Sequence, residues 1–213
     1  MYLPAHFAES RPQVLRDFIA AHPLGLLVTQ NRAGGIDANS VPFFLDAGDD
    51  GTPGVLRAHV ARANPLWKEA RDDVDTLVVF QGPHGYVSPA WYPSKAEHGK
   101  VVPTWNYVMV QARGRLRAVD DKAWLRAFVT RLTDHHEGGR AEPWAVSDAP
   151  AAFIEATLGA IVGIEIPLSS LVGKWKVSQN RSAADRAGVA AGLLRERDDS
   201  VLAAEVNAPG GSA

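Results

Sequence analysis

The first half of the chain is a series of short apolar runs joined by turn signals, and this order constrains the fold more than any other feature. Residues 24–29 and 36–45 flank the turn cluster Asn31–Gly35, as the two arms of a hairpin do. A second turn cluster, residues 46–53, leads into residues 54–60, whose side chains alternate between the two faces of a strand. Because these runs follow one another without long crossover helices, the sequence predicts an antiparallel sheet.

Helical patterns flank and interrupt these strands. Ser10 and Pro12 are typical of a helix start, and this helix is expected to end before Pro23. We expect further helices over residues 64–70, 121–132, 148–158 and 187–194, further strands over residues 76–80, 107–119 and 161–168, a polar loop over 135–143 and a disordered tail over 207–213. The predicted fold class is therefore mainly β (α+β), an antiparallel barrel with peripheral helices.

Charge and composition exclude several classes of protein. The chain has 22 basic and 24 acidic residues and a formal net charge of −2, so as a whole it does not attract nucleic acid or an anionic membrane. No apolar run approaches the ~20 residues of a spanning helix, and the first residues lack the features of a secretory signal. The absence of cysteine excludes disulfides and thiolate metal sites, so we expect a cytoplasmic protein.

The common catalytic and metal motifs are missing. The sequence has no GxGxxG, GxxxxGK[ST], GxSxG or HExxH pattern. His135, His136 and Glu137 are adjacent, whereas two imidazoles need i, i+4 spacing to face one metal ion from a helix. We therefore predict no metal site, and the sequence assigns no catalytic residue.

Residues 85–107 combine aromatic rings with polar side chains in a proline-rich segment. Its three prolines remove backbone donors, so much of the segment is not expected to form helix or central strand. Two interpretations stay open. The segment is either a rigid connection that caps a barrel end, or a loop that presents rings, hydroxyls, amides and ammonium groups to a ligand.

Two other segments carry the charges of an anion site. A strand places Arg57 and His59 on one face. The chain then passes Arg62 and reaches a helix start at Asn64, where free backbone N–H groups favour a phosphate. Residues 173–181 (GKWKVSQNR) place two ammonium groups, a guanidinium and two amides around one tryptophan, which suits phosphate, carboxylate or a nucleic-acid backbone. The alternatives are ordinary surface arginines at a strand edge and a solvated basic loop.

These segments resemble the signature segments of the PaiB-type FMN-binding negative transcriptional regulators. The resemblance lies in HVARANPLW, GPHGYVSPAWYPSKAEHGKVVPTWNY and GKWKVSQNRSAADRAGV, together with MYLPAHF and HPLGLLVT near the start, and it extends from Met1 to about Leu194. It implies a split antiparallel β-barrel like that of the pyridoxamine-phosphate oxidase group, a homodimer, and FMN at the subunit interface. We accordingly expect one FMN-binding domain over residues 1–197 and a C-terminal tail over 198–213.

The resemblance also implies four groups of FMN-binding residues. One group holds the phosphate, one lies against the isoalloxazine ring, one comes from the opposite subunit, and one lines the mouth of the site. In that order they are Arg57, His59, Arg62 and Asn64; Asn39, Ser40, Val41 and Pro42; Trp105, Asn106 and Tyr107; and Lys174, Lys176, Gln179 and Arg181.

Two functions fit this resemblance, and the sequence leaves open whether the protein is an enzyme. One is a flavoprotein with a regulatory output. The other is an FMN-dependent oxidoreductase that acts on a small planar substrate, with NAD(P)H as a candidate donor; a flavin-free or haem-handling barrel is a third alternative. Neither a helix-turn-helix nor a basic stripe is evident, so direct DNA binding stays open beside regulation through the flavin or a partner protein.

Overall fold

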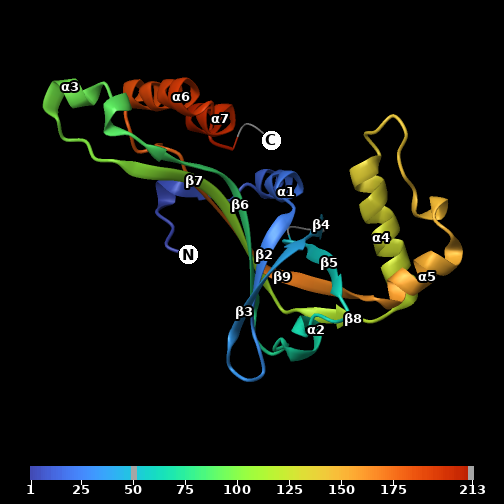
Figure 1. Ribbon diagram of the computed structural model, residues 1–213. Coiled ribbons are helices and arrows are strands. Elements are labelled where there is room, and N and C mark those ends of the chain that lie inside the picture. Colours follow the sequence, from blue (N-terminus) through green and yellow to red (C-terminus); the bar gives the residue numbers. More distant parts are fainter. Residues whose placement is uncertain (49–51, 211–213) are drawn as a thin grey trace. The chain divides into compact units, whose positions relative to one another are not determined.

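The computed structural model describes residues 1–48 and 52–210 as antiparallel strands accompanied by helices (Figure 1). The strands are β1 (Ala8–Glu9), β2 (Leu24–Gln30), β3 (Ile36–Pro42), β4 (Phe44–Asp46), β5 (Val55–Ala61), β6 (Thr76–Val87), β7 (Thr104–Gly114), β8 (Arg117–Val119) and β9 (Ile161–Lys176). The helices are α1 (Pro12–Ala21), α2 (Leu66–Glu69), α3 (Ser94–His98), α4 (Lys122–Glu137), α5 (Ala151–Gly159), α6 (Ala183–Arg197) and α7 (Ser200–Asn207). Short 3-10 helices, η1 to η3, cover Ala5–Phe7, Pro89–Trp91 and Val146–Asp148.

The strands join in the order β3-β2-β6-β7-β9-β5-β4, and β1 and β8 each pair with β9. The pairs β1–β9, β2–β3, β4–β5, β5–β9 and β8–β9 are all antiparallel. The predicted antiparallel sheet with helices is therefore confirmed.

The chain divides into two compact units, which are described separately. Unit 1 consists of Met1–His22, Val79–Gln111 and Leu171–Ala213, and unit 2 consists of Pro23–Val78 and Ala112–Ser170. Both units are discontinuous in sequence. Three of the four boundaries fall inside strands β6, β7 and β9, and the fourth lies between α1 and β2. The sequence predicted one domain through residue 197, and no pattern in it marked these boundaries.

Unit 2 is built around the pairing of β5 with β9. Leu56 lies opposite Ile166 and Ala58 lies opposite Ile164, and all four side chains are fully buried. Because side chains alternate along a strand, Arg57 and His59 lie on the other face of β5, which α4 covers. The β2–β3 hairpin also belongs to unit 2. Its strands pair from Leu24 with Pro42 to Gln30 with Ile36, as the turn cluster predicts.

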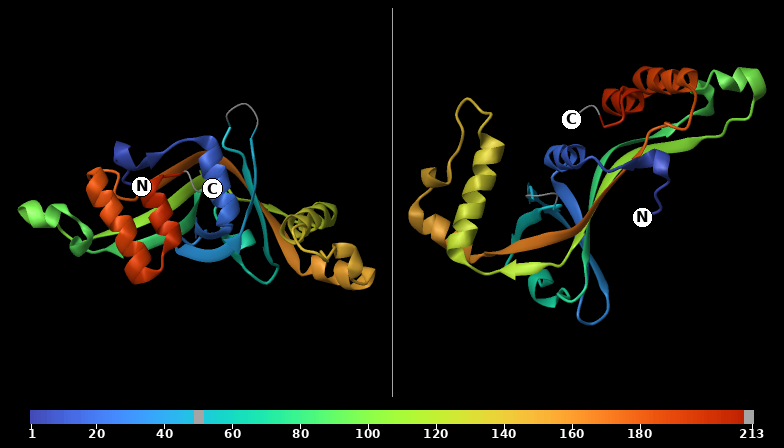
Figure 2. Two further views of the ribbon diagram at one scale, coloured as in Figure 1. Left: turned by 90° about the horizontal axis from the view of Figure 1, so that it is seen from above. Right: turned by 180° about the vertical axis from the view of Figure 1, so that it is seen from behind.

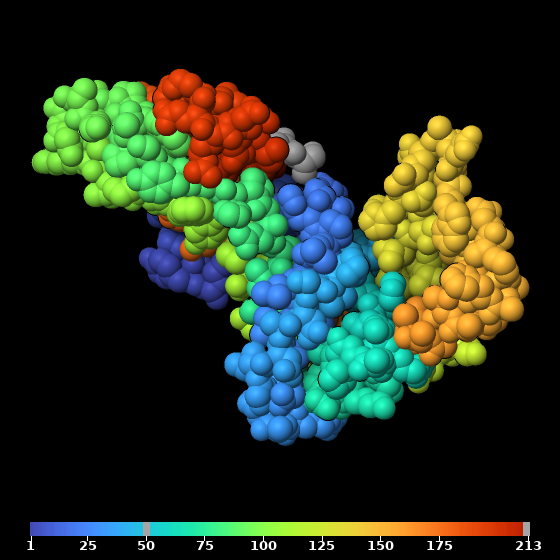
Figure 3. All heavy atoms as spheres, viewed as in Figure 1, coloured from blue at the N-terminus to red at the C-terminus, as the bar shows by residue number. Residues whose placement is uncertain are grey.

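Unit 1 holds both ends of the chain. Helix α1 buries Leu15, Phe18 and Ile19, the helical spacing seen in the sequence. Helices α6 and α7 lie side by side (Figure 2). In the space-filling view the red C-terminal helices lie directly against the green segment that contains η2 (Figure 3). Glycines of α6 permit this contact, since Gly188 faces the backbone of Trp91.

Three elements are longer than the sequence pattern predicts. The strand expected to end at Phe80 continues through Pro83 to Val87, because the φ of proline is compatible with extended backbone. Strand β9 runs to Lys176, well beyond the expected end at residue 168. Helix α4 ends at Glu137, so the first part of the predicted polar loop 135–143 is helical, and the helix stops where Gly138 and Gly139 follow.

The C-terminal region also differs from the expected tail. Residues 200–207 form α7, because Asp199 caps the helix by accepting a hydrogen bond from the Leu202 N–H, and Leu202 and Val206 are fully buried. Residues 211–213, the last part of the tail expected to be disordered, lie outside the described residues. No helix in the described part of the chain has both the length and the apolarity needed to cross a membrane.

We expect Gly188→Ala to destabilise the protein. A Cβ at this position would lie 2.1 Å from the carbonyl oxygen of Trp91, so α6 must move away from η2. The overpacking costs about 1–3 kcal/mol, which outweighs the gain of about 1 kcal/mol in helix propensity. Urea unfolding measures the change. Gly159→Ala is the control, because no atom lies within 4 Å of the added Cβ, and equal unfolding midpoints for the two variants would contradict the predicted clash.

Candidate functional site

Unit 2 contains a cavity of about 580 Å³ beside β3 and the turn that leads into α2. We call it the Asn64 cavity. It is lined by Asp37, Ala38, Asn39, Ala63, Asn64, Pro65, Leu66 and Glu69. Its volume lies in the range of about 300–1,000 Å³ that is usual for small-molecule and cofactor sites.

Asn64 links the two walls of this cavity. Its side-chain Nδ2 donates to Oδ1 of Asn39 at 3.0 Å, and its Oδ1 accepts from the Leu66 N–H at 2.9 Å. The second bond is the cap that the Asn-Pro pair predicts. The structure therefore brings together two of the predicted FMN-binding residues, which come from different predicted groups. Of the remaining predicted β3 residues, Val41 belongs to the core, whereas Ser40 and Pro42 are exposed.

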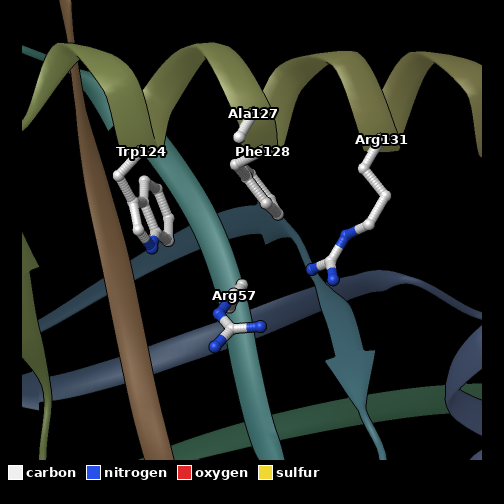
Figure 4. Close-up of a pocket in the computed structure, with 5 residues that line it drawn as sticks. All are labelled: Arg57, Trp124, Ala127, Phe128 and Arg131. Carbon is white, nitrogen blue, oxygen red and sulfur yellow. The ribbon is translucent and has the colours of Figure 1, made fainter.

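Arg57 lies in a different place, under helix α4. It lines a pocket of about 280 Å³ together with Trp124, Ala127, Phe128 and Arg131, which project from α4 toward the strands (Figure 4). Glu165 stands directly opposite Arg57 on β9 and accepts a hydrogen bond from its Nε at 2.7 Å. Asp46 forms ion pairs with both Arg57 and Arg131. Two guanidinium groups thus face two carboxylates, so the charge of Arg57 is already neutralised within the protein.

Arg62 is also engaged by protein groups. It donates two hydrogen bonds to the carboxylate of Asp120, at 2.8 and 2.5 Å, and further bonds to the carbonyl oxygens of Gly159 and Ile161. The hydrogen bond from Arg62 holds the pKa of Asp120 below its ordinary value. The bidentate pair fixes the turn before α2 to the segment between β8 and α4, and the two carbonyl bonds fix it to the start of β9.

His59 points to the same side of β5 as Arg57. Its ring packs edge-on against Phe128, with 6.2 Å between ring centroids. Burial lowers the pKa of His59, so its imidazole is neutral at pH 7. Its Nδ1 is buried and has no hydrogen-bond partner among residues 1–48 and 52–210. Of the four predicted phosphate ligands, the Asn64 cavity therefore contains Asn64 alone.

Unit 1 contains an aromatic face on β7. Trp105 and Tyr107 point to the same side and line a pocket of about 250 Å³ with Gln81, His84 and Met109. The rings of Trp105 and His84 are stacked, 6.0 Å apart, and the indole N–H donates to His84 Nδ1 at 3.3 Å. Trp105 is 47% exposed, so its ring is available to stack on a planar molecule.

The predicted C-terminal motif forms a separate, smaller pocket in the same unit. We call it the Lys176 pocket. It measures about 130 Å³ and is lined by Phe7, Tyr92, Thr104, Asn106, Lys176, Ser178, Asn180 and Arg181. Asn106 points to this side of β7, opposite Trp105, and bonds to the Ser178 hydroxyl at 3.0 Å. Gln179 accepts from the Val177 N–H and donates to the Trp175 carbonyl, so its amide holds its own turn.

Several lining residues were not among the predicted ligands, although local sequence signals existed for some of them. Ser178 and Asn180 belong to the GKWKVSQNR motif, and Tyr92 and Thr104 belong to the aromatic segment. The sequence assigned no role to His84, whose ring is stacked on Trp105. In the described ranges, no three His, Asp or Glu side chains gather in a way that could hold a metal ion.

Comparisons with known proteins identify relatives along most of the chain. Residues 1–170 match the family model described as "Putative FMN-binding domain". The Bacillus subtilis protein named "Protease synthase and sporulation protein PAI 2" is 30% identical over 93% of this chain and 91% of its own length. An uncharacterized protein of Aspergillus fumigatus is 36% identical over 91% of this chain and 90% of its own length.

A solved structure shares the fold. The flavocytochrome Anf3 from Azotobacter vinelandii superposes with a TM-score of 0.57 at 18% identity, over 79% of this chain and 69% of that one. The similarity agrees with the predicted mainly β, split-barrel fold class with peripheral helices.

We expect His59 to make the protein less stable in mild acid. Because burial lowers its pKa, the unfolded chain binds a proton at His59 below about pH 6.5 more readily than the folded chain does, so stability falls with decreasing pH. Replacement of His59 by leucine should make the decline in unfolding free energy between pH 7 and pH 5 shallower. Urea unfolding at several pH values measures this decline.

A second histidine serves as an internal reference in that experiment. Burial also lowers the pKa of His22, and its contribution has the same sign and remains in both proteins. The difference between the two curves therefore isolates His59, and parallel curves would contradict the assignment.

Proposed function

We propose, since this chain belongs to the family described as "Putative FMN-binding domain", that it is a homodimeric flavoprotein whose output is regulatory. The resemblance to PaiB-type proteins noted in the sequence is confirmed, because the Bacillus subtilis PAI 2 protein is a relative along nearly its whole length. FMN is the cofactor that the family implies. When bound, FMN supplies redox chemistry at its ring system, and the protein supplies binding and orientation.

The Asn64 cavity is the observation that carries the proposal. It is large enough for a cofactor, and the side chains of Asn39 and Asn64 supply amide donors and acceptors on adjacent walls. No lysine or arginine lines this cavity. We therefore propose that Asn39 and Asn64 orient the flavin through hydrogen bonds. Arg57 and Arg62, already paired with carboxylates, act by holding the surrounding strands.

The aromatic face of β7 supports the proposed dimer. Trp105 and Tyr86 are 47% and 40% exposed, and their rings contact each other edge-on at 6.4 Å. Exposed aromatic side chains of this kind are typical of surfaces that a partner covers. We propose that a second copy of the chain covers this face and that Trp105 and Tyr107 of one subunit contribute to the flavin site of the other.

The regulatory output rests on the relative and on the absence of an obvious catalytic set. The name of the Bacillus subtilis relative refers to protease synthase and sporulation. In this chain, the two lined pockets of unit 2 contain no nucleophile paired with a base. We propose that the flavin biases contacts with a partner protein or with DNA, in the cytoplasm.

A second candidate function is an FMN-dependent oxidoreductase. The observation in its favour is the pocket of about 250 Å³ on the aromatic face, where Trp105 and Tyr107 could stack on a small planar substrate. In this function the same rings bind and orient a substrate instead of a partner surface.

We expect the purified protein to bind FMN. Asn64→Ala should weaken that binding about tenfold, because it removes a half-buried hydrogen-bonding side chain. The change in the flavin absorbance spectrum during titration measures the affinity. Asn207→Ala, at the exposed end of α7, is the control and should bind like the unmodified protein. A protein that leaves the spectrum of added FMN unchanged would remove the basis of the proposal.

The two candidate functions predict different behaviour of the FMN-loaded dimer. For a regulator, we expect a salt-sensitive shift of DNA or capture of a partner protein, with little anaerobic bleaching of the flavin by NADH or NADPH. For an oxidoreductase, we expect rapid bleaching and re-oxidation by an acceptor. Sedimentation analysis of the same sample tests the dimer, and a monomer at micromolar concentration would contradict it.

A further inference from the structure

The Lys176 pocket collects positive charge in a partly enclosed part of unit 1. Lys176 and Arg181 line the pocket, and Lys174 precedes it on β9. Lys174 is only 7% exposed. Its ammonium group donates to the Tyr2 carbonyl oxygen at 3.0 Å, and that of Lys176 donates to the Thr104 hydroxyl at 2.7 Å and to the Trp105 carbonyl. Arg181 lies over the ring of Tyr92, 5.0 Å from its centroid.

These three cations lack the carboxylate partners that several arginines of unit 2 have. Arg57, Arg62 and Arg126 each form an ion pair with an acidic side chain. Among all the ion pairs of the described ranges, none includes Lys174, Lys176 or Arg181. The cluster therefore holds positive charge that no ion pair of the described residues neutralises.

Asp185 is the acidic side chain that interacts electrostatically with Arg181, but its carboxylate is already committed. It accepts hydrogen bonds from the backbone N–H and the hydroxyl of Ser94, at 3.1 and 2.9 Å. Desolvation, followed by the charges of Lys174 and Arg181, lowers the pKa of Lys176. An anion in the pocket would offset the desolvation of Lys176 and its repulsion by Lys174 and Arg181, because it supplies an opposite charge.

The backbone around the pocket is held in an unusual conformation. Ser178 has a φ of +70°, in the left-handed region that non-glycine residues rarely adopt. The Arg181 N–H donates to the Ser178 carbonyl, and the Gln179 side chain bonds to the backbone of Val177 and Trp175, just before Ser178. Asn106 and Ser178, which are 1% and 3% exposed, bond to each other at the pocket wall. Such conformations persist where the surroundings hold them, and they gather at binding sites.

We infer that the Lys176 pocket binds a small oxyanion, the phosphate or carboxylate group of a small molecule, through Lys176, Arg181 and the polar side chains of Thr104 and Ser178. The volume of about 130 Å³ holds such a group together with water but is below the usual range for a cofactor ring system. The site does not depend on the proposed flavin function. It is distinct from the Asn64 cavity, whose lining residues all belong to unit 2.

Isothermal titration of the full chain with sodium phosphate, and separately with succinate, at low ionic strength tests the inference. We expect saturable binding of at least one of the two anions, which identifies the preferred oxyanion. Lys176→Gln and Arg181→Gln should each weaken it about tenfold or more, because each removes a charge-assisted contact. Lys100→Gln, an exposed lysine of the same unit outside the pocket, is the matched control and should bind like the unmodified protein.

Two results would overturn the inference. One is the absence of saturable binding of either anion by the unmodified protein. The other is an equal affinity for the anion in all three variants and the unmodified protein. Circular dichroism verifies that each variant is folded. If one of the two pocket variants fails to fold, the other provides the test, because Lys176 and Arg181 contact the pocket from different sides of the Ser178 turn.

A further titration tests whether the Lys176 pocket binds the phosphate group of FMN itself. Titration with FMN and with riboflavin, which lacks the phosphate, gives the preference of each variant for FMN. We expect Lys176→Gln and Arg181→Gln to keep the preference of the unmodified protein. Loss of that preference would assign the pocket to the flavin phosphate and overturn a separate site. If FMN does not bind at all, the proposed function fails while the phosphate titration still decides the anion site.

Discussion

The antiparallel pairing of β5 with β9 is the contact on which the candidate site of unit 2 depends. It places Leu56, Ala58 and Val60 against Ile166, Ile164 and Val162, and thereby forms the centre of a core. The same alternation sends Arg57 and His59 to the opposite face, beneath α4. At the end of β5 the chain must turn, and the bonds from Arg62 to Asp120 and to the start of β9 hold that turn. Asn64 is consequently presented to β3, where it meets Asn39.

The distribution of ion pairs differs between Arg57 and Arg62 of unit 2 and the cations of the Lys176 pocket. Arginines that the chain neutralises internally hold strands and helices together, as the Arg57–Glu165 cross-strand pair does. Lys176 and Arg181, which form no ion pair among the described residues, line the Lys176 pocket that we propose as the anion site. The family relationship makes FMN the cofactor of this chain. Neutral amides, and neither Arg57 nor Arg62, line the Asn64 cavity that we propose for it.

Local sequence patterns were sufficient for much of the fold. The turn cluster between two apolar runs predicted the β2–β3 hairpin, and Asn64-Pro65 predicted the start of α2, because both signals depend on backbone preferences of a few residues. The extension of β6 through Pro83 and the formation of α7 were not predictable in the same way. The first is supported by pairing with neighbouring strands, and the second by burial of Leu202 and of the Trp175–Glu205 hydrogen bond. Both depend on residues far away in the chain.

By itself, the sequence determined the family, the antiparallel character of the sheet, and which segments carry aromatic and charged side chains. These properties follow from composition, periodicity and motif order, which a linear chain displays directly. Only the tertiary structure decided which charges stay free. Arg57, Arg62, Lys176 and Arg181 are equally cationic in the sequence, but the first two meet Glu165 and Asp120, more than fifty positions away, whereas the last two form no ion pair among the described residues. The physical reason is that a charge is neutralised by its neighbours in space, and folding chooses those neighbours.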